Sequence, residues 1–259
     1  MLKENRQQKI FTLLQNKEEI LVKELCNIFQ VSDMTIRRDL ADLESAGVIR
    51  RTFGGAVING AIPETAAFPG AYVKPSEKGA DVKSKIALKA IELIKPGYTI
   101  FIDSGTTTSP IARNLPDSSK ITVVTSNLRV INEISRKTEV AAIVIGGFLR
   151  NETLSCYGPQ TEEQIRQYKV DIAFLGASSV GEDGNFYDGY PPEAGVKKSI
   201  MQSASETYVL VDSSKFGKYE LISYSSIREV TGIITDSGIN PDHLISLRQM
   251  DANVIVVDV

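Results

Sequence analysis

The chain has 259 residues, enough for two domains or for one large α/β domain. Hydrophobic residues make up 42% and charged residues 24%, a globular composition that excludes a disordered, collagen-like or disulfide-built protein. The formal net charge of −3 excludes binding to nucleic acid through bulk charge, so any DNA contact must depend on local placement of basic residues.

Residues suited to metal binding or histidine-based catalysis are scarce. Cys26 and Cys156 stand alone, and His243 is the only histidine. No apolar run approaches the ~18 residues of a membrane span, and the polar first residues form no secretory signal. We therefore expect a cytoplasmic protein without a metal, another cofactor, a disulfide or a membrane partner.

The first 57 residues predict three short helices followed by a β-hairpin. Apolar residues repeat at helical spacing around residues 10–14 and again over residues 22–29. Ser32 is a good N-cap for a third helix from about Asp33 to Ser45, and Gly47 is a candidate C-cap. Residues 48–53, a turn at Gly54-Gly55 and residues 56–58 predict a hairpin, to which residues 19–21 can add a strand. This order is that of a winged helix-turn-helix, whose third helix enters the DNA major groove.

Basic residues of this segment gather on the third helix and the hairpin. On the third helix Ile36, Leu40 and Leu43 form one apolar stripe, and Arg38 lies on the opposite side. We expect the helix to contact bases and phosphates, and the hairpin to hold the DNA backbone. The predicted DNA-binding residues are Ser32, Thr35, Arg37, Arg38, Arg50 and Arg51.

An alternating α/β region follows a segment rich in Ala, Gly and Pro. We predict a linker over residues 58–79 and an α/β domain over residues 80–259. Its predicted strands are nearly continuous apolar runs, as in a parallel sheet covered on both faces by helices. The predicted strands are residues 99–102, 121–124, 140–145, 172–175, 207–211, 233–235 and 254–257. The predicted helices are residues 82–94, 107–115, 128–135, 162–168 and 193–203.

Polar and glycine-rich loops follow four of these strands. The first combines a glycine turn, several hydroxyls and a helix N-terminus, which suits a phosphate, although it lacks the spacing of a P-loop. Ligands of open α/β sheets bind at the carboxyl ends of the strands, so the loops can share one small polar ligand, with Arg150 and Lys215 as its charge partners. Each loop taken singly can also be a simple helix cap. The predicted ligand-binding residues are Asp103, Ser104, Gly105, Thr106, Thr107, Thr125, Asn127, Gly146, Gly147, Arg150 and Lys215.

Two further charged residues, Glu193 and Lys197, lie four apart on a predicted helix. This spacing is typical of an ion pair on a solvated helix face, and we expect both side chains to be exposed. The loop of residues 176–179 contains no carboxylate, which gives no support for acid–base catalysis there.

Motifs in both parts of the chain resemble those of one family. The N-terminal motifs are Glu24-Leu25, Val31-Ser32, Thr35-Ile36-Arg37-Arg38-Asp39-Leu40, and Gly47-Val48-Ile49-Arg50-Arg51 followed by Gly54-Gly55-Ala56. The C-terminal motifs are Asp103-Ser104-Gly105-Thr106-Thr107, Gly146-Gly147 with Arg150, Phe174-Leu175-Gly176-Ala177 and Val211-Asp212-Ser213-Ser214-Lys215-Phe216-Gly217. Over nearly the whole chain they are similar to the DeoR family of bacterial transcriptional regulators.

This resemblance implies a repressor, usually of a sugar or sugar-alcohol utilisation operon. Its implied partners are double-stranded operator DNA, read by a homodimer or homotetramer, and a phosphorylated sugar effector. It also implies a sensor domain related in fold to ribose-5-phosphate isomerase. The carboxylate-bearing loop of that isomerase would fall at residues 176–179, where acidic residues are missing, so we expect no catalytic residue. The stretch Tyr190-Pro191-Pro192 is unusual for the family and bears on effector choice.

Two alternatives stay open on the sequence alone. One is an active phosphosugar isomerase with an appended helix-turn-helix. The other is a protein-interaction module that uses the winged helix without DNA, since that segment carries a formal charge of only +1.

Overall fold

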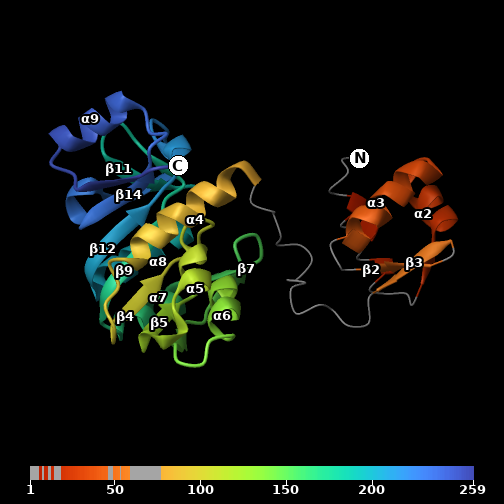
Figure 1. Cartoon of the computed structure of the whole chain (residues 1–259), viewed down its shortest axis with the longest axis horizontal. Coiled ribbons are helices and arrows are strands. Elements are labelled where there is room, and N and C mark those ends of the chain that lie inside the picture. Colours follow the sequence, from red (N-terminus) through yellow and green to blue (C-terminus); the bar gives the residue numbers. More distant parts are fainter. Residues whose placement is uncertain are drawn as a thin grey trace. The chain divides into compact units, whose positions relative to one another are not determined.

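The computed structural model describes residues 6–7, 9–10, 13–14, 19–45, 49–52, 54–58 and 77–259. The chain divides into two compact units, Met1–Val73 and Lys74–Val259, which we describe separately (Figure 1). Most of the predicted linker lies outside the described residues. Helix α4 (Glu77–Ile91) begins within its last residues, five positions earlier than the periodicity predicts. The predicted domain limits otherwise stay predictions.

The first unit is a winged helix-turn-helix. Helix α2 (Val22–Phe29) and helix α3 (Asp33–Ser45) pack beside a three-stranded antiparallel sheet in the order β1-β3-β2. Its strands are β1 (Ile20–Leu21), β2 (Ile49–Arg51) and β3 (Gly55–Ile58). Residues 6–7, 9–10 and 13–14 are also helical. The predicted order of elements is therefore confirmed, while Gly47, Val48 and Phe53 lie outside the described residues.

The apolar stripe of α3 fills the core of this unit. Ile36 and Leu40 are buried against Leu25 and Ile49, and Leu43 is half-buried beside them. The backbone N–H of Thr35 donates to the Ser32 hydroxyl at 3.3 Å, the capping contact that the sequence predicts. Burial of one stripe leaves the opposite side of α3 facing solvent.

The second unit is built on a seven-stranded parallel sheet in the order β15-β14-β12-β9-β4-β5-β6. Its main elements in chain order are α4, β4 (Thr99–Ile102), α5 (Ser109–Asn114), β5 (Thr122–Thr125), α6 (Leu128–Ile134), β6 (Ala141–Val144), α7 (Pro159–Arg166), β9 (Val170–Gly176), α8 (Pro191–Ser203), β12 (Ala204–Leu210), β14 (Gly232–Asp236), α9 (Pro241–Gln249) and β15 (Val254–Val257).

Alternating side chains of the strands supply two apolar layers. On one face Ile100 and Ile102 pack with Ile86 of α4 and Ile111 of α5, and α6 completes this layer (Figure 1). On the other face Phe101 and its neighbours pack with α7 and α8. Since successive residues of a strand point to opposite faces, a strand buried on both sides must be apolar throughout. The sequence prediction of a two-sided parallel sheet is confirmed.

Short elements that the sequence analysis did not predict cover part of the α8 face. A hairpin joins β7 (Phe148–Arg150) to β8 (Ser155–Tyr157), and a small antiparallel sheet contains β10 (Ser179–Val180), β11 (Asn185–Asp188) and β13 (Ile222–Ser226). Each strand has five residues or fewer, too short for a clear alternating pattern.

The position of the candidate site is set by β4, which pairs with β5 on one side and with β9 on the other. At this point the strand order reverses, where open α/β sheets bind ligands.

Candidate functional site

Helix α3 and the wing carry the residues predicted to contact DNA. Arg38 is exposed, and neither it nor Arg50 on strand β2 makes an ion pair with another residue that the structure describes. Thr35 is half-buried, and its hydroxyl lies 2.9 Å from that of Ser32. Arg38 and Arg50 are therefore the two predicted basic residues whose guanidinium groups are open to a phosphate or a base.

The other two arginines are held by carboxylates of the same unit. Arg37 pairs with Asp33 one turn earlier on α3. Arg51 on the wing donates to Glu44 of α3 through its backbone N–H at 2.9 Å and through Nε at 2.6 Å. These contacts with Arg51 hold the pKa of Glu44 below its usual value. Glu44 thus ties the wing to the third helix and sets where Arg51 lies.

In the second unit the loop after β4 forms a tight hydroxyl-rich turn. The Thr108 hydroxyl donates to the Asp103 carbonyl at 2.8 Å, and the Ser109 hydroxyl donates to the Gly105 carbonyl at 2.6 Å. A Cβ atom at Gly105 would lie 2.9 Å from the Thr108 hydroxyl, so the turn has no room for a larger residue. Thr106 is exposed at the turn. We call residues 103–108 the hydroxyl loop.

One lysine from another element contacts the hydroxyl loop, and the charge of a second lysine acts on the first. Lys83 of α4 donates from Nζ to the Thr106 hydroxyl at 2.8 Å. Burial lowers the pKa of Lys83; the nearby charge of Asp212 opposes this shift, and that of Lys215 adds to it. Lys215 belongs to a short 3-10 helix, Ser213–Lys215, which follows β12. Lys215 therefore lies close enough to Lys83 for its charge to act on it, and Lys83 contacts the hydroxyl loop. The sequence analysis did not predict Lys83, because it precedes the first strand of the sheet.

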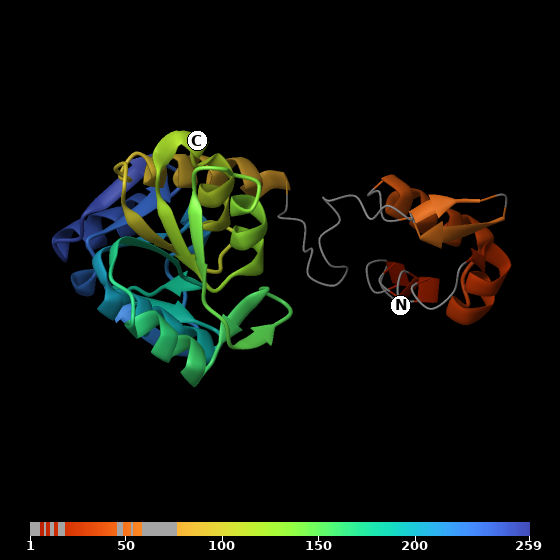
Figure 2. The same cartoon turned by 90° about the horizontal axis from the view of Figure 1, so that it is seen from below.

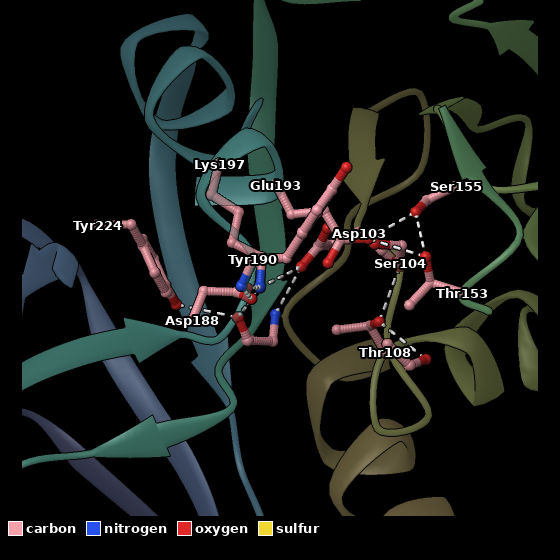
Figure 3. A network of polar contacts seen from close by, with 12 residues as sticks. Asp103, Ser104, Thr108, Thr153, Ser155, Asp188, Tyr190, Glu193, Lys197 and Tyr224 are labelled. Atoms are coloured by element: carbon pink, nitrogen blue, oxygen red, sulfur yellow. Dashed lines mark hydrogen bonds and ion pairs between the residues drawn. The ribbon is translucent and has the colours of Figure 1, made fainter. Parts of the chain in front are cut away.

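Lys197 of α8 is a buried charged residue beside the hydroxyl loop (Figure 3). Lys197 is 5% exposed; its Nζ lies 2.7 Å from the Asp188 carboxylate and 3.5 Å from that of Asp103. Asp103 also accepts from the Gly176 N–H at 3.0 Å, and the Gly176 carbonyl accepts from Lys197 and from the Tyr224 hydroxyl. Burial opposes the charge of Lys197, but the two carboxylates more than offset it, so its pKa is raised. The loop after β4 is thereby tied to the end of β9 across the switch point.

Glu193, one turn earlier on α8, faces the β7–β8 hairpin (Figure 3). Its carboxylate accepts from Arg150 at 2.9 Å, from Thr153 at 2.8 Å and from Ser155 at 2.7 Å. Arg150 lies over the Tyr190 ring, 4.2 Å from its centroid. Glu193 is only 7% exposed. The expectation that Glu193 and Lys197 form a solvated pair is therefore wrong, because the polar hairpin and the aspartates give each charge its own buried partner.

Several predicted ligand residues have their polar groups bonded within the protein. The Thr125 hydroxyl donates to the Ile102 carbonyl at 2.7 Å, which ties the ends of β5 and β4. The Asn127 side chain caps α6 and donates to the Thr153 carbonyl at 2.9 Å. Gly147 has φ +152°, and a Cβ there would meet Thr161 and Tyr157. Thr125 and Asn127 thus tie the loop after β5 to its neighbours, and Gly147 shapes the turn between β6 and β7, which Gly146 begins.

The described residues contain no group of three or more side chains suited to hold a metal ion. Among the helices that the structure describes, none combines the length and the apolar character of a membrane span. What the two units present is a winged helix with an open basic face and an α/β domain with a lysine-flanked loop at the switch point. This combination defines a DNA-binding protein with a separate ligand-sensing domain.

Comparison with known proteins gives the family. The DeoR-like helix-turn-helix domain matches residues 6–61, and the DeoR C terminal sensor domain matches residues 78–237. The glycerol-3-phosphate regulon repressor of Escherichia coli strain K12 is 32% identical, with 92% of each chain covered. Transcriptional repressor AccR of Agrobacterium fabrum is 33% identical, covering 91% of this chain and 90% of that one. The chain belongs to the DeoR family and is a DNA-binding transcriptional regulator, not an enzyme.

Solved structures resemble the chain more distantly. Ribose-5-phosphate isomerase A from Methanocaldococcus jannaschii gives a TM-score of 0.40 at 24% identity, covering 53% of this chain and 55% of that chain. The full-length sorbitol operon regulator SorC from Klebsiella pneumoniae gives 0.40 at 14% identity, covering 95% of this chain and 99% of that chain. Both scores are below 0.5, so neither likeness bears on function.

Proposed function

We propose that this regulator is a repressor of an operon for the use of a sugar or sugar alcohol, and that a phosphorylated sugar bound at the hydroxyl loop controls it. The regulator binds double-stranded operator DNA as a homodimer or homotetramer. The names of similar repressors support the kind of operon, among them that of the glycerol-3-phosphate regulon. The effector proposal is supported chiefly by one contact, that of Lys83 with Thr106.

A phosphate is the ligand chemistry that this contact favours. Lys83 places a positive charge on the hydroxyl of Thr106, and the charges of Asp212 and Lys215 both act on Lys83. Lysine is a common phosphate partner, and hydrogen bonds between charged groups are about twice as strong as neutral ones. Since burial has already removed part of the hydration of Lys83, an anion that binds there supplies a partner for its charge.

The rest of the ligand lies toward the buried charges of α8. Asp103 and Arg150 offer a carboxylate and a guanidinium, which suit the hydroxyl groups of a sugar or polyol. Tyr190 lies against Arg150 and begins the Tyr190-Pro191-Pro192 stretch, so we propose that this stretch sets which sugar is accepted. We propose no catalytic residue here.

The first unit recognises the operator through α3 and the wing. Arg38 and Thr35 contact bases from the major groove, with Ser32 and Arg37 beside them, and the wing arginines contact phosphates. Arg50 is open for such a contact, and Arg51 makes it while its backbone N–H stays bonded to Glu44.

The experiment that tests this proposal measures binding of the full chain to its own upstream DNA by fluorescence anisotropy at fixed salt. Glycerol 3-phosphate, hexose 6-phosphates, the unphosphorylated sugars and inorganic phosphate are added in turn. We expect one sugar phosphate to change DNA affinity at a concentration at which its unphosphorylated sugar has no effect. DNA binding that ignores every phosphate would overturn the effector proposal, and no DNA binding would overturn the operator proposal.

A further inference from the structure

Strand β6 is an edge of the seven-stranded sheet, and its surface is apolar and open. Ala141, Ala142 and Val144 are exposed, and Val144 keeps 52% of its surface accessible. Its neighbour β5 is buried at three of its four positions. Apolar side chains at an open sheet edge are unusual because such an edge can pair with another chain.

The usual protection of an edge strand is missing here. From Val140 to Leu149 the sequence contains no charged residue and no proline. Natural proteins protect exposed edges with charges, proline or bulges. The absence of all charge also means that two copies of this segment can meet without placing like charges together.

The backbone of β6 has hydrogen-bonding groups available for a further strand. The N–H groups of Ala141 and Ile145 donate inward, to Ile121 and Thr125 at 3.1 and 2.9 Å. Because alternate residues of a strand direct their N–H and C=O groups to opposite sides, those of Ala142 and Val144 point away from the sheet.

The β7–β8 hairpin continues this apolar surface. It projects from the body of the second unit (Figure 2), and Phe148 and Leu149 on it are 63% and 44% exposed. The Phe148 ring lies beside that of Tyr157, with 6.1 Å between centroids, and Arg150 ties the hairpin to Glu193. The hairpin is therefore held in place while its apolar side chains face outward.

We propose that β6 and the β7–β8 hairpin form an interface between two copies of this chain, in which β6 pairs antiparallel with β6 of the second copy. A pair of identical edge strands meets about a two-fold axis, so the same unpaired groups satisfy each other. A stable interface buries about 800 Å² per partner, more than a four-residue strand pair provides, and Phe148 and Leu149 add to it. The inference says which surface joins the copies of the proposed oligomer, and only this part of it rests on the proposed function. Its test uses neither DNA nor ligand: assembly through another surface overturns this inference alone, and operator and effector binding are measured separately.

The test is sedimentation equilibrium on the full chain and on three variants. Ala142→Pro removes one outward N–H and leaves the bonds to β5 in place. Phe148→Asp puts a charge on the apolar surface. Leu88→Asp is the control, since Leu88 is 48% exposed on α4, which packs over β14 and β15 at the other end of the sheet. We expect the wild type and Leu88→Asp to assemble alike, and both other variants to associate at least tenfold more weakly.

Hydrogen–deuterium exchange on the wild type tests the same surface without a variant that can misfold. Amides of peptides covering residues 141–149 should gain protection as the protein concentration rises through the dissociation constant. A wild type that stays monomeric overturns the proposal, as does assembly of Ala142→Pro or Phe148→Asp at wild-type strength. Concentration-independent exchange over residues 141–149 also overturns it, and then the copies meet elsewhere.

Discussion

At the residue scale, Lys83 is the side chain whose environment most clearly suggests a ligand. Burial lowers the pKa of Lys83 even though the charge of Asp212 opposes that shift, and its Nζ contacts a threonine hydroxyl. Structural lysines in the same unit look different. Lys89 on the same helix pairs with Glu92 at the surface, and Lys197 has two carboxylates in contact.

Replacing Lys83 with Ala should weaken binding of the active sugar phosphate by roughly 10- to 100-fold, the effect of one lost hydrogen bond between charged groups. Titration calorimetry on the full chain measures this. Lys89→Ala is the matched control and should bind like the wild type. Equal affinities for the wild type and Lys83→Ala would remove Lys83 from the site.

The lowered pKa of Lys83 gives the binding a pH dependence. The phosphate prefers the protonated lysine, so affinity stays level while free Lys83 is charged and falls as the pH rises above its pKa. Because burial lowers that pKa, the fall begins at lower pH than for an ordinary lysine. Calorimetry between about pH 7 and pH 10 should show this fall in the wild type and not in Lys83→Ala. Parallel curves for the two proteins would contradict the assignment.

The contribution of Lys197 to the stability of the second unit can be measured by unfolding. Lys197→Ala leaves the carboxylates of Asp103 and Asp188 buried without their cation, which should cost about 3–5 kcal/mol of unfolding free energy. Lys198→Ala is its matched control, since Lys198 is the exposed next residue of the same helix. Urea unfolding followed by circular dichroism compares the two. A loss below about 1 kcal/mol, as for an exposed ion pair, would show that the buried pair is not what holds α8 to the loop after β4.

At the element scale, the bonds between Glu44 and Arg51 join helix α3 to the wing, so we expect the two to bind DNA as one surface. A bidentate contact of Arg38 with guanine predicts that Arg38→Ala loses about 1–3 kcal/mol of operator binding and discriminates less between operator and mutated sites. Arg50→Ala should instead weaken binding to all DNA sequences alike and reduce the salt dependence by about one phosphate contact. Anisotropy titrations on two DNA sequences at several salt concentrations separate these effects. Unchanged operator affinity in Arg38→Ala would exclude Arg38 from the interface.

The elements also show what the sequence could predict. Long periodic segments were predictable, since burial of one stripe fixes α3 and burial of both faces fixes strands such as β4 and β9. The β7–β8 hairpin was not, because strands of three residues are too short to show an alternating pattern, and Arg150 and Ser155 on them bond to Glu193. Glu193 and Lys197 resembled a surface pair because they lie four residues apart on one helix, the spacing of an exposed ion pair. Their true partners, Arg150 and Asp188, are 43 and 9 residues away in sequence.

At the scale of the whole molecule, the proposed function requires that the hydroxyl loop and the operator surface share one equilibrium. A ligand changes DNA binding only through different affinities for two arrangements of the protein. Helix α4 carries Lys83 and begins at Glu77, directly after the segment that joins the two units. A phosphate bound between Lys83 and Thr106 therefore acts on the first element beyond that segment.

The most direct measurement is the affinity of the active sugar phosphate for the full chain, free and saturated with operator DNA. Thermodynamic linkage requires that DNA change ligand affinity by the same factor by which ligand changes DNA affinity, and the factor is typically about 5- to 150-fold. We predict equal factors, measured by calorimetry in one direction and by anisotropy in the other. The same sugar phosphate affinity with and without operator would contradict the account.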